Sequence, residues 1–416
     1  MFCFSLISGV FVWADDTSRS ASTPTGQKDI LERGKHLFQG YCAHCHGKFG
    51  DGDGFNAEFL DRDPTALSNP EFLAKRSNDK LFRVISEGGA RVKKSHLMPV
   101  FGHTLSEEEI WSLIVFIRHL GKDEVLVTVP EGVKSKKPMR PVLTRSDMTS
   151  FSKWFAEKGQ EKEQVDTGRL LVMNKISCLG CHQLNDEGGR IGPNLNRSFL
   201  NYKPEWIYAW ISNPQFFRPN TKMPNLGLAP EEARAIASFL VSFLPEKEGE
   251  EIKFEVPEEW KQYFFTKGDP KRGEKIFNDS EGKANCAKCH LIKGQGGAVG
   301  PELSFVGTSR TREFLLESIL DPDAVITSGY KTILILTNEG KFITGIKKNV
   351  DGSGFDIVDK NGKDRHIPRN RIKKFKIQKV STMPGNFKDL LETQEVADLL
   401  AYLGTLTLPT ITASVH

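Results

Sequence analysis

The sequence predicts a mainly α-helical chain of three similar helical modules in tandem, with a small antiparallel β insertion in the third. Three observations support this fold class. The pattern Cys-x-x-Cys-His occurs three times, beginning at Cys42, Cys178 and Cys286. Each copy follows a short helical pattern that contains glycine and precedes a Met-Pro pair and an amphipathic helix. Between the last motif and its Met-Pro pair, short segments rich in Ile, Val and Phe replace the helical periodicity.

The Cys-x-x-Cys-His pattern is the attachment signature of c-type haem. One helical turn presents two thiols to the vinyl groups of a porphyrin, and the next residue supplies an imidazole to the iron. A zinc knuckle or a dithiol redox pair is the alternative for a single copy. Structural zinc uses four ligands, however, and each motif offers three. We therefore predict three covalently bound haem c groups on Cys42, Cys45, His46, Cys178, Cys181, His182, Cys286, Cys289 and His290.

The helix that closes each module has start signals and an apolar face. In the first module Ser106 and Glu109 predict a capping box, and in the second Pro230 occupies the helix start. The apolar positions recur at helical spacing. They are Ile110, Leu113, Ile114 and Ile117, then Ile236, Phe239, Leu240 and Phe243, then Val396, Leu399, Leu400 and Leu403. The three modules therefore share one plan.

On these residues the chain resembles three class I cytochrome c domains in tandem. In that family an N-terminal helix crosses the C-terminal helix, the motif histidine is the proximal iron ligand, and a later methionine is the distal one. The resemblance implies three axial pairs, which are His46 with Met98, His182 with Met223 and His290 with Met383. A thioether favours ferrous iron, so this ligation raises the reduction potential. Packing of the core is the alternative role for any one methionine.

A Gly-Pro pair follows two of the motifs. Gly192-Pro193 and Gly300-Pro301 each begin ten residues after the motif histidine. In the family such a proline offers its carbonyl to the imidazole N–H. The first module has Pro64 at a different spacing, so the resemblance assigns no partner to His46. Three further histidines, His96, His103 and His366, are expected at the surface.

The third module carries an insertion at residues 328–380. Its motif histidine and Met-Pro pair are 93 residues apart, against 41 in the second module. The predicted strands are separated by turn residues, and the arrangement resembles the planctomycete-type haem-binding domain. The strands are expected at 332–336, 342–346 and 355–358.

The ends of the modules follow from these patterns. The apolar stretch at residues 1–14 is shorter than the roughly 20 residues that span a bilayer and is typical of a secretory signal. A retained membrane tether is the alternative. No later segment is expected to cross a membrane. Covalent haem attachment is expected outside the cytoplasm, so we predict a periplasmic or otherwise exported protein. The cytochrome domains are expected at 26–121, 161–245 and 260–408, with exposed, extended linkers at 122–160 and 246–259.

Charge is informative only locally. The formal net charge of +4 gives no indication of nucleic-acid binding. The insertion, however, has 13 Lys and Arg against 5 Asp and Glu. Such a patch either steers an acidic redox partner or protects an exposed edge strand from self-association. The lysines Lys373, Lys374 and Lys376 are the candidates for both roles.

Two protein ligands on every iron would leave no position for a substrate. The sequence therefore predicts a three-haem electron-transfer protein between a respiratory donor, such as a quinol-oxidising complex or dehydrogenase, and a terminal acceptor. The alternatives are a peroxidase-like enzyme with one open haem, most readily the one near Met383, and the cytochrome subunit of a larger redox complex. The sequence gives no oligomeric state.

Overall fold

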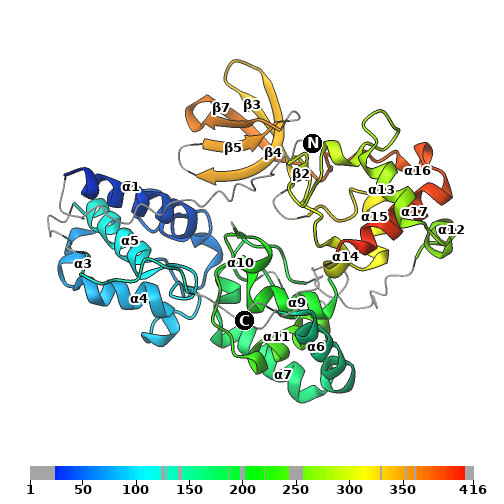
Figure 1. Ribbon diagram of the computed structural model, residues 1–416. Helices are drawn as coiled ribbons and strands as arrows, with labels where there is room; N and C mark the ends of the chain where they lie inside the picture. Colours follow the sequence, from blue (N-terminus) through cyan, green and yellow to red (C-terminus); the bar gives the residue numbers. More distant parts are fainter. Residues whose placement is uncertain are drawn as a thin grey trace, which may run out of the picture.

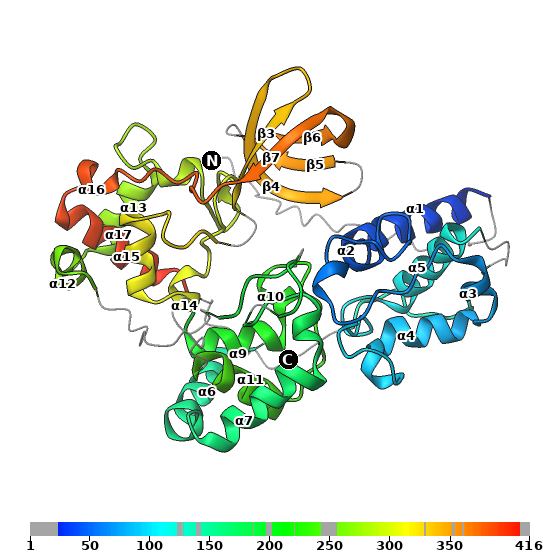
Figure 2. The same cartoon turned by 180° about the vertical axis from the view of Figure 1, so that it is seen from behind.

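The computed structural model describes residues 24–122, 127, 129–138, 143–185, 187–196, 202–219, 221–242, 256–327, 330–351, 354–359 and 362–407. The predicted signal at 1–14 and most of the predicted acidic linker at 246–259 lie outside these residues. Figures 1 and 2 show three helical groups in chain order and a sheet that stands between the first and the third. The mainly α fold with a small antiparallel sheet is thereby confirmed.

The first module is built on two long helices that cross, α1 and α5. Its elements are α1 (Pro24–Tyr41), α2 (Ala43–His46), η1 (Ala57–Phe59), α3 (Pro70–Ala74), α4 (Asn78–Arg91) and α5 (Glu107–Leu120). The predicted capping box is present. Ser106 Oγ accepts a hydrogen bond from Glu109 N at 3.1 Å, and Glu109 Oε2 accepts one from Ser106 N at 2.9 Å. These bonds fix the start of α5, whose predicted apolar face is buried.

The second module repeats this plan with α7 and α11 as the crossing helices. Its elements are α6 (Arg145–Lys158), α7 (Lys162–Leu170), η2 (Leu171–Lys175), η3 (Ser177–Gly180), α9 (Pro204–Ser212), α10 (Pro214–Phe217) and α11 (Pro230–Ser242). Pro230 begins α11 as predicted, because a first-turn residue has no intrahelical use for its N–H. Ile236, Phe239 and Leu240 are buried, and Phe243 lies outside the described residues.

The predicted extended linker at 122–160 is wrong for its second half, which forms helix α6. A capping box at Thr144 begins the helix. Phe151 is buried and stacks on Tyr208 of α9, with ring centroids 4.4 Å apart. Charged residues lie between the apolar positions of this segment, so its composition alone does not indicate a packed helix. The second module therefore begins earlier in the chain than residue 161.

The third module uses α13 and α17 as its crossing pair. Its helical elements are η4 (Glu258–Trp260), α12 (Lys261–Phe265), α13 (Pro270–Asn278), η5 (Cys286–Lys288), α14 (Val306–Ser309), α15 (Arg312–Leu320), α16 (Phe387–Leu390) and α17 (Thr393–Thr405). A two-stranded ribbon, β1 (Leu291–Ile292) with β2 (Gln295–Gly296), follows the motif. The predicted face of α17 is buried at Val396, Leu399, Leu400 and Leu403.

A glycine allows the backbones to meet at each of the three helix crossings. A Cβ built on this glycine would lie 2.0 Å from a backbone oxygen of the closing helix, far inside van der Waals contact. The three contacts are Gly34 with Ser112 O, Gly168 with Ala235 O and Gly273 with Asp398 O. Only a residue without a side chain permits this approach. The glycines in the helical patterns ahead of the motifs thus have a packing role.

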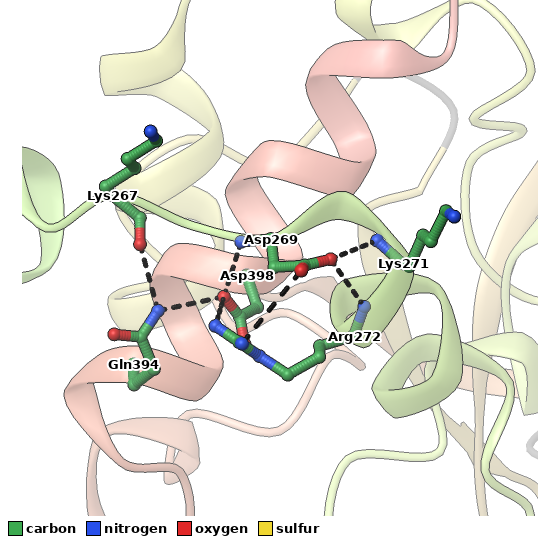
Figure 3. A network of polar contacts seen from close by, with 6 residues as sticks. All are labelled: Lys267, Asp269, Lys271, Arg272, Gln394 and Asp398. Carbon is green, nitrogen blue, oxygen red and sulfur yellow. Dashed lines mark hydrogen bonds and ion pairs between the residues drawn. The ribbon is translucent and has the colours of Figure 1, made fainter.

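A buried carboxylate strengthens the third crossing (Figure 3). The Asp398 side chain on α17 is 2% exposed. It accepts hydrogen bonds from Arg272 Nε at 2.7 Å and Nη2 at 3.0 Å, from Asp269 N at 2.6 Å and from Gln394 Nε2 at 2.9 Å. Asp269 in turn caps α13. The start of α13 is therefore fixed to the middle of α17.

The insertion folds as one five-stranded antiparallel sheet with the order β6-β5-β4-β3-β7. Its strands are β3 (Thr332–Thr337), β4 (Phe342–Asp351), β5 (Gly354–Val358), β6 (Asp364–Pro368) and β7 (Ile372–Ile377), with η6 (Arg369–Arg371) before the last. The three predicted strands are confirmed within β3, β4 and β5. The two edge strands were missed because their sequences are charged. The sheet packs around Ile333, Ile335, Phe355, Ile357 and Ile367.

Candidate haem-binding sites

Each Cys-x-x-Cys-His motif forms a single helical turn that follows the first helix of the crossing pair in its module. The turns are α2, η3 and η5. In each of them the backbone N–H of the histidine donates to the backbone carbonyl of the first cysteine. The distances are 2.9 Å for His46 to Cys42, 2.9 Å for His182 to Cys178 and 3.0 Å for His290 to Cys286. This turn gathers two thiols and an imidazole within one short segment, as the sequence predicts.

All three motif histidines are oriented in the same way by a backbone carbonyl. His182 Nδ1 lies 2.7 Å from Pro193 O, and His290 Nδ1 lies 2.8 Å from Pro301 O, as the Gly-Pro pairs imply. For His46, the acceptor is Thr65 O at 2.9 Å. An imidazole that donates from Nδ1 keeps the Nε2 lone pair for a metal. Each module therefore presents one ring nitrogen suited to haem iron.

Burial keeps these imidazoles neutral. It lowers the pKa of His46, His182 and His290, and the hydrogen bond to the carbonyl opposes the shift only in part. A neutral imidazole is the form that coordinates metal. The three rings thus have both the tautomer and the charge state of an iron ligand.

The cysteines are also in dry surroundings. Burial raises the pKa of the Cys42, Cys178 and Cys181 thiols to about 12 and that of Cys286 to about 11. The nearby Cys45 thiol of the first module contributes to the shift at Cys181 in the second. The first two motifs therefore lie close together. Buried, uncharged thiols fit a site that takes up an apolar porphyrin.

The glycines of the Gly-Pro pairs lie directly against the imidazole rings of the motif histidines. A Cβ built on Gly192 would lie 2.5 Å from His182 Cε1 and Nδ1, and one built on Gly300 would lie 2.8 Å from His290 Cε1. A side chain at either position would displace the imidazole. The proximal side of both sites is therefore shaped around the ring, and the donor set fits haem c.

The three methionines expected as distal ligands are half-buried, and each packs against the core of its own module. Met223 N donates to Thr221 Oγ1 at 3.3 Å, and Met383 N donates to Ser381 Oγ at 3.1 Å. In the first module, the N–H that bonds the equivalent serine belongs to the residue before Met98. In each module a Ser or Thr hydroxyl thus accepts from the backbone N–H two residues further on, which belongs to the methionine or to the residue before it. Ligation of iron by these methionines stays a prediction.

Sequence reasoning missed a partner of the second methionine. Trp210 Nε1 on α9 donates to Met223 Sδ at 2.9 Å. Thioether sulfur is a weak acceptor with more than one lone pair, so this bond is compatible with ligation through the other. A single tryptophan 13 residues before the methionine gave no signal in the sequence.

Of the three histidines expected at the surface, one is exposed and two are half-buried. His366 is exposed and its Nδ1 lies 2.7 Å from Asp356 Oδ1, as a surface residue would. His96 and His103 are half-buried instead. Within the described residues, no group of three or more His, Cys, Asp or Glu side chains converges as a metal site would require.

Comparison with known protein families agrees with this geometry. The family model described as cytochrome c oxidase, cbb3-type, subunit III matches residues 29–117. The model described as cytochrome c matches residues 165–243 and 270–341. The chain contains cytochrome c-type domains. Such domains bind haem c covalently and use it in electron transfer. The last cytochrome c match ends between β3 and β4, so that Met383 lies beyond it.

Other comparisons add little to the cytochrome c assignment. No curated protein matches the chain. Among solved structures, a chain of a reducing HAO-like protein complex from Kuenenia stuttgartiensis matches with 18% identity and a TM-score of 0.19, over 52% of this chain and 98% of that one. A TM-score of this size supports no inference. No helix in the described part of the chain has the length and apolar character to span a bilayer.

Proposed function

We propose that the protein is a three-haem c-type cytochrome that relays single electrons between partner proteins. The observation that supports this best is the repeated histidine geometry, in which each imidazole donates from Nδ1 to a carbonyl and keeps Nε2 for iron. Haem c, when bound, supplies a one-electron couple at its iron. The motif cysteines would hold the porphyrin, and the motif histidines would bind its iron.

The methionines are proposed as distal ligands, with Met98, Met223 and Met383 each serving its own module. Each methionine is half-buried and packs against the core of its own module, which keeps it near the haem motif of that module. An iron with two protein ligands has no free position for a substrate. The proposed role is therefore electron transfer, and no bond-making step is assigned to the chain.

A spectroelectrochemical titration of the holoprotein tests this function. We expect three haems per chain, three one-electron steps and low-spin spectra without rapid cyanide binding. Met223→Leu should open one iron to cyanide, while Met173→Leu, which changes a methionine of the same module outside the proposed ligand set, should not. Rapid cyanide binding by the unaltered protein would instead favour an enzyme with an open haem.

Trp210→Phe is expected to lower the reduction potential of the second haem. Its indole N–H draws electron density from Met223 Sδ, which weakens the sulfur as a donor to ferric iron. A hydrogen bond of about 1 kcal/mol made in one oxidation state corresponds to about 40 mV for one electron. Redox titration measures the shift. Trp206→Phe, which alters the tryptophan stacked on Trp210, is the control and should leave the potential unchanged.

The proposed setting is the periplasm or another exported compartment, where covalent haem attachment is expected. The proposed partners are a respiratory donor, such as a quinol-oxidising complex or dehydrogenase, and a terminal acceptor. Strand β7 offers a candidate contact surface. Lys373, Lys374 and Lys376 are exposed on this edge strand, next to an exposed Phe375.

Changing these three lysines to glutamate tests whether they steer an anionic partner. Ferricyanide serves as an anionic oxidant, and we expect its rate constant with the reduced protein to fall about tenfold at low ionic strength. The same charge change at Lys153, Lys158 and Lys175, exposed residues of the second module, is the control and should have a smaller effect. Equal rate constants for both variants would contradict steering. The remaining role of the β7 lysines would then be to protect this edge strand from self-association.

A further inference from the structure

The haem motifs of the first and second modules meet at one buried side chain, Asn56. This residue follows the first motif and has no exposed surface. Its Nδ2 donates to Gly180 O at 2.7 Å, and its Oδ1 accepts from Arg190 N at 2.7 Å, both in the second module. The same Nδ2 lies 3.4 Å from Cys45 Sγ in the first module. One amide therefore contacts the attachment segments of both haems.

Gly180 brings the second motif against the methionine loop of the first module. It is the residue just before Cys181, and a Cβ built on it would lie 2.0 Å from Leu97 O. Leu97 precedes Met98 and packs against the core of the second module. No side chain fits at this position while the two modules stay in contact.

The opposite contact is also present. Lys222, which precedes Met223, places its Nζ 5.0 Å from the centre of the Tyr41 ring, directly before the first motif. Beyond the two methionines, Asn225 N donates to Thr104 Oγ1 at 2.8 Å, and both residues are buried. The chain at or next to each of the two motifs therefore contacts the methionine loop of the other module.

The second and third modules meet in a different way. Their contacts join α9 and α10 to the region of α14. Lys203 Nζ donates to Gly307 O at 2.8 Å, Lys203 N donates to Ser309 O at 3.2 Å, and Phe217 packs edge-on to Phe305 at 6.4 Å between ring centroids. None of these three contacts involves a residue of the third haem motif.

We propose that the first and second modules form one di-haem unit, in which the charge on either haem shifts the reduction potential of the other, with Asn56 and Gly180 as positioning residues. Charges held close together in a dry interface interact far more strongly than charges in water. The third haem, whose motif takes no part in the contacts between the first two modules, is expected to titrate independently. The inference rests on the proposed function, because it requires a haem in each of the first two modules.

Gly180→Lys is the variant that tests the unit. The third motif already has a lysine, Lys288, at the equivalent position, so haem attachment tolerates this residue. At Gly180 the new side chain would meet Leu97 O and separate the modules. Two haems held in close contact give an exciton couplet in the circular dichroism of the Soret band. We expect the couplet of the holoprotein to fall to less than half, while the haem count stays at three.

Gly404→Lys is the matched control, because the same change occurs on α17 in open space. It should leave the couplet and all three redox steps unchanged. Asn56→Leu is a second variant of similar volume that lacks the amide and is outside the motifs. It should weaken the couplet and reduce the separation of two of the three redox steps, leaving the third step in place.

The outcomes separate this inference from the proposed function. An unaltered holoprotein with three haems but no couplet would overturn the di-haem unit and leave the electron-transfer function standing. So would a couplet that survives in both Gly180→Lys and Asn56→Leu with the full haem count. A holoprotein with fewer than three haems would count against the proposed function itself.

Discussion

Replacing Gly273 with alanine is expected to lower the free energy of unfolding of the third module by about 3 kcal/mol, the upper part of the range for overpacked cores. The new Cβ would lie 2.0 Å from Asp398 O, a backbone atom in the middle of α17, so the two helices would have to separate. Denaturant unfolding of the holoprotein, followed by circular dichroism and haem absorbance, measures the loss.

Gly404→Ala is the matched control in the same module. No atom outside its own helix lies within 4 Å of the position of its Cβ, and alanine is the better helix former. We expect this variant to be neutral or more stable by less than about 1 kcal/mol. If both variants unfolded at the same denaturant concentration, close approach of the helices would not be what holds the module together.

Asp398→Asn is expected to reduce the stability of the third module by about 2 kcal/mol at neutral pH, because donors built around a carboxylate lose their charged acceptor. Burial alone would raise the pKa of Asp398. The hydrogen bonds from Arg272, Asp269 N and Gln394 outweigh it and lower the pKa below the usual value of 3.8. The carboxylate therefore stabilises the fold above that value, and this contribution is lost as the pH falls through the lowered pKa.

The pH dependence distinguishes the charge from simple packing. The difference in unfolding free energy between the unaltered protein and Asp398→Asn should be constant near pH 7 and shrink below about pH 4. Denaturant titrations at both pH values measure it. Asp389→Asn, at an exposed carboxylate of α16, should show little difference at either pH. A difference that persisted unchanged in acid would point to altered shape at position 398 instead of lost charge.

Features set by short-range chemistry could be predicted from the sequence. The three motif turns, the capping box at Ser106 and the start of α11 at Pro230 depend on residues a few positions apart, and the structure has all of them. The carbonyl partners Pro193 and Pro301 follow from the family resemblance. Thr65 could not be found in this way, because any residue can offer a backbone carbonyl and no side chain identifies the one that does.

Features set by tertiary contact were missed for a related reason. Strands β6 and β7 are charged because they form the edges of the sheet, so they lack the apolar alternation that reveals inner strands. The sequence of helix α6 is typical of a linker, and its apolar face is recognised only from its packing on α9. Trp210 and Asn56 take their roles from groups 13 and 124 residues away along the chain. Such pairings exist only after the chain has folded.

The sheet of the third module enters and leaves through neighbouring strands. β3 and β7 pair directly, and Thr332 Oγ1 donates to Val380 O at 2.6 Å at the point where they begin and end. The two ends of the insertion are therefore held together by β3 and β7. Its length adds little to the conformational entropy of the chain that leads to Met383. The module could therefore gain a β insertion of this size during evolution without loosening the position of Met383.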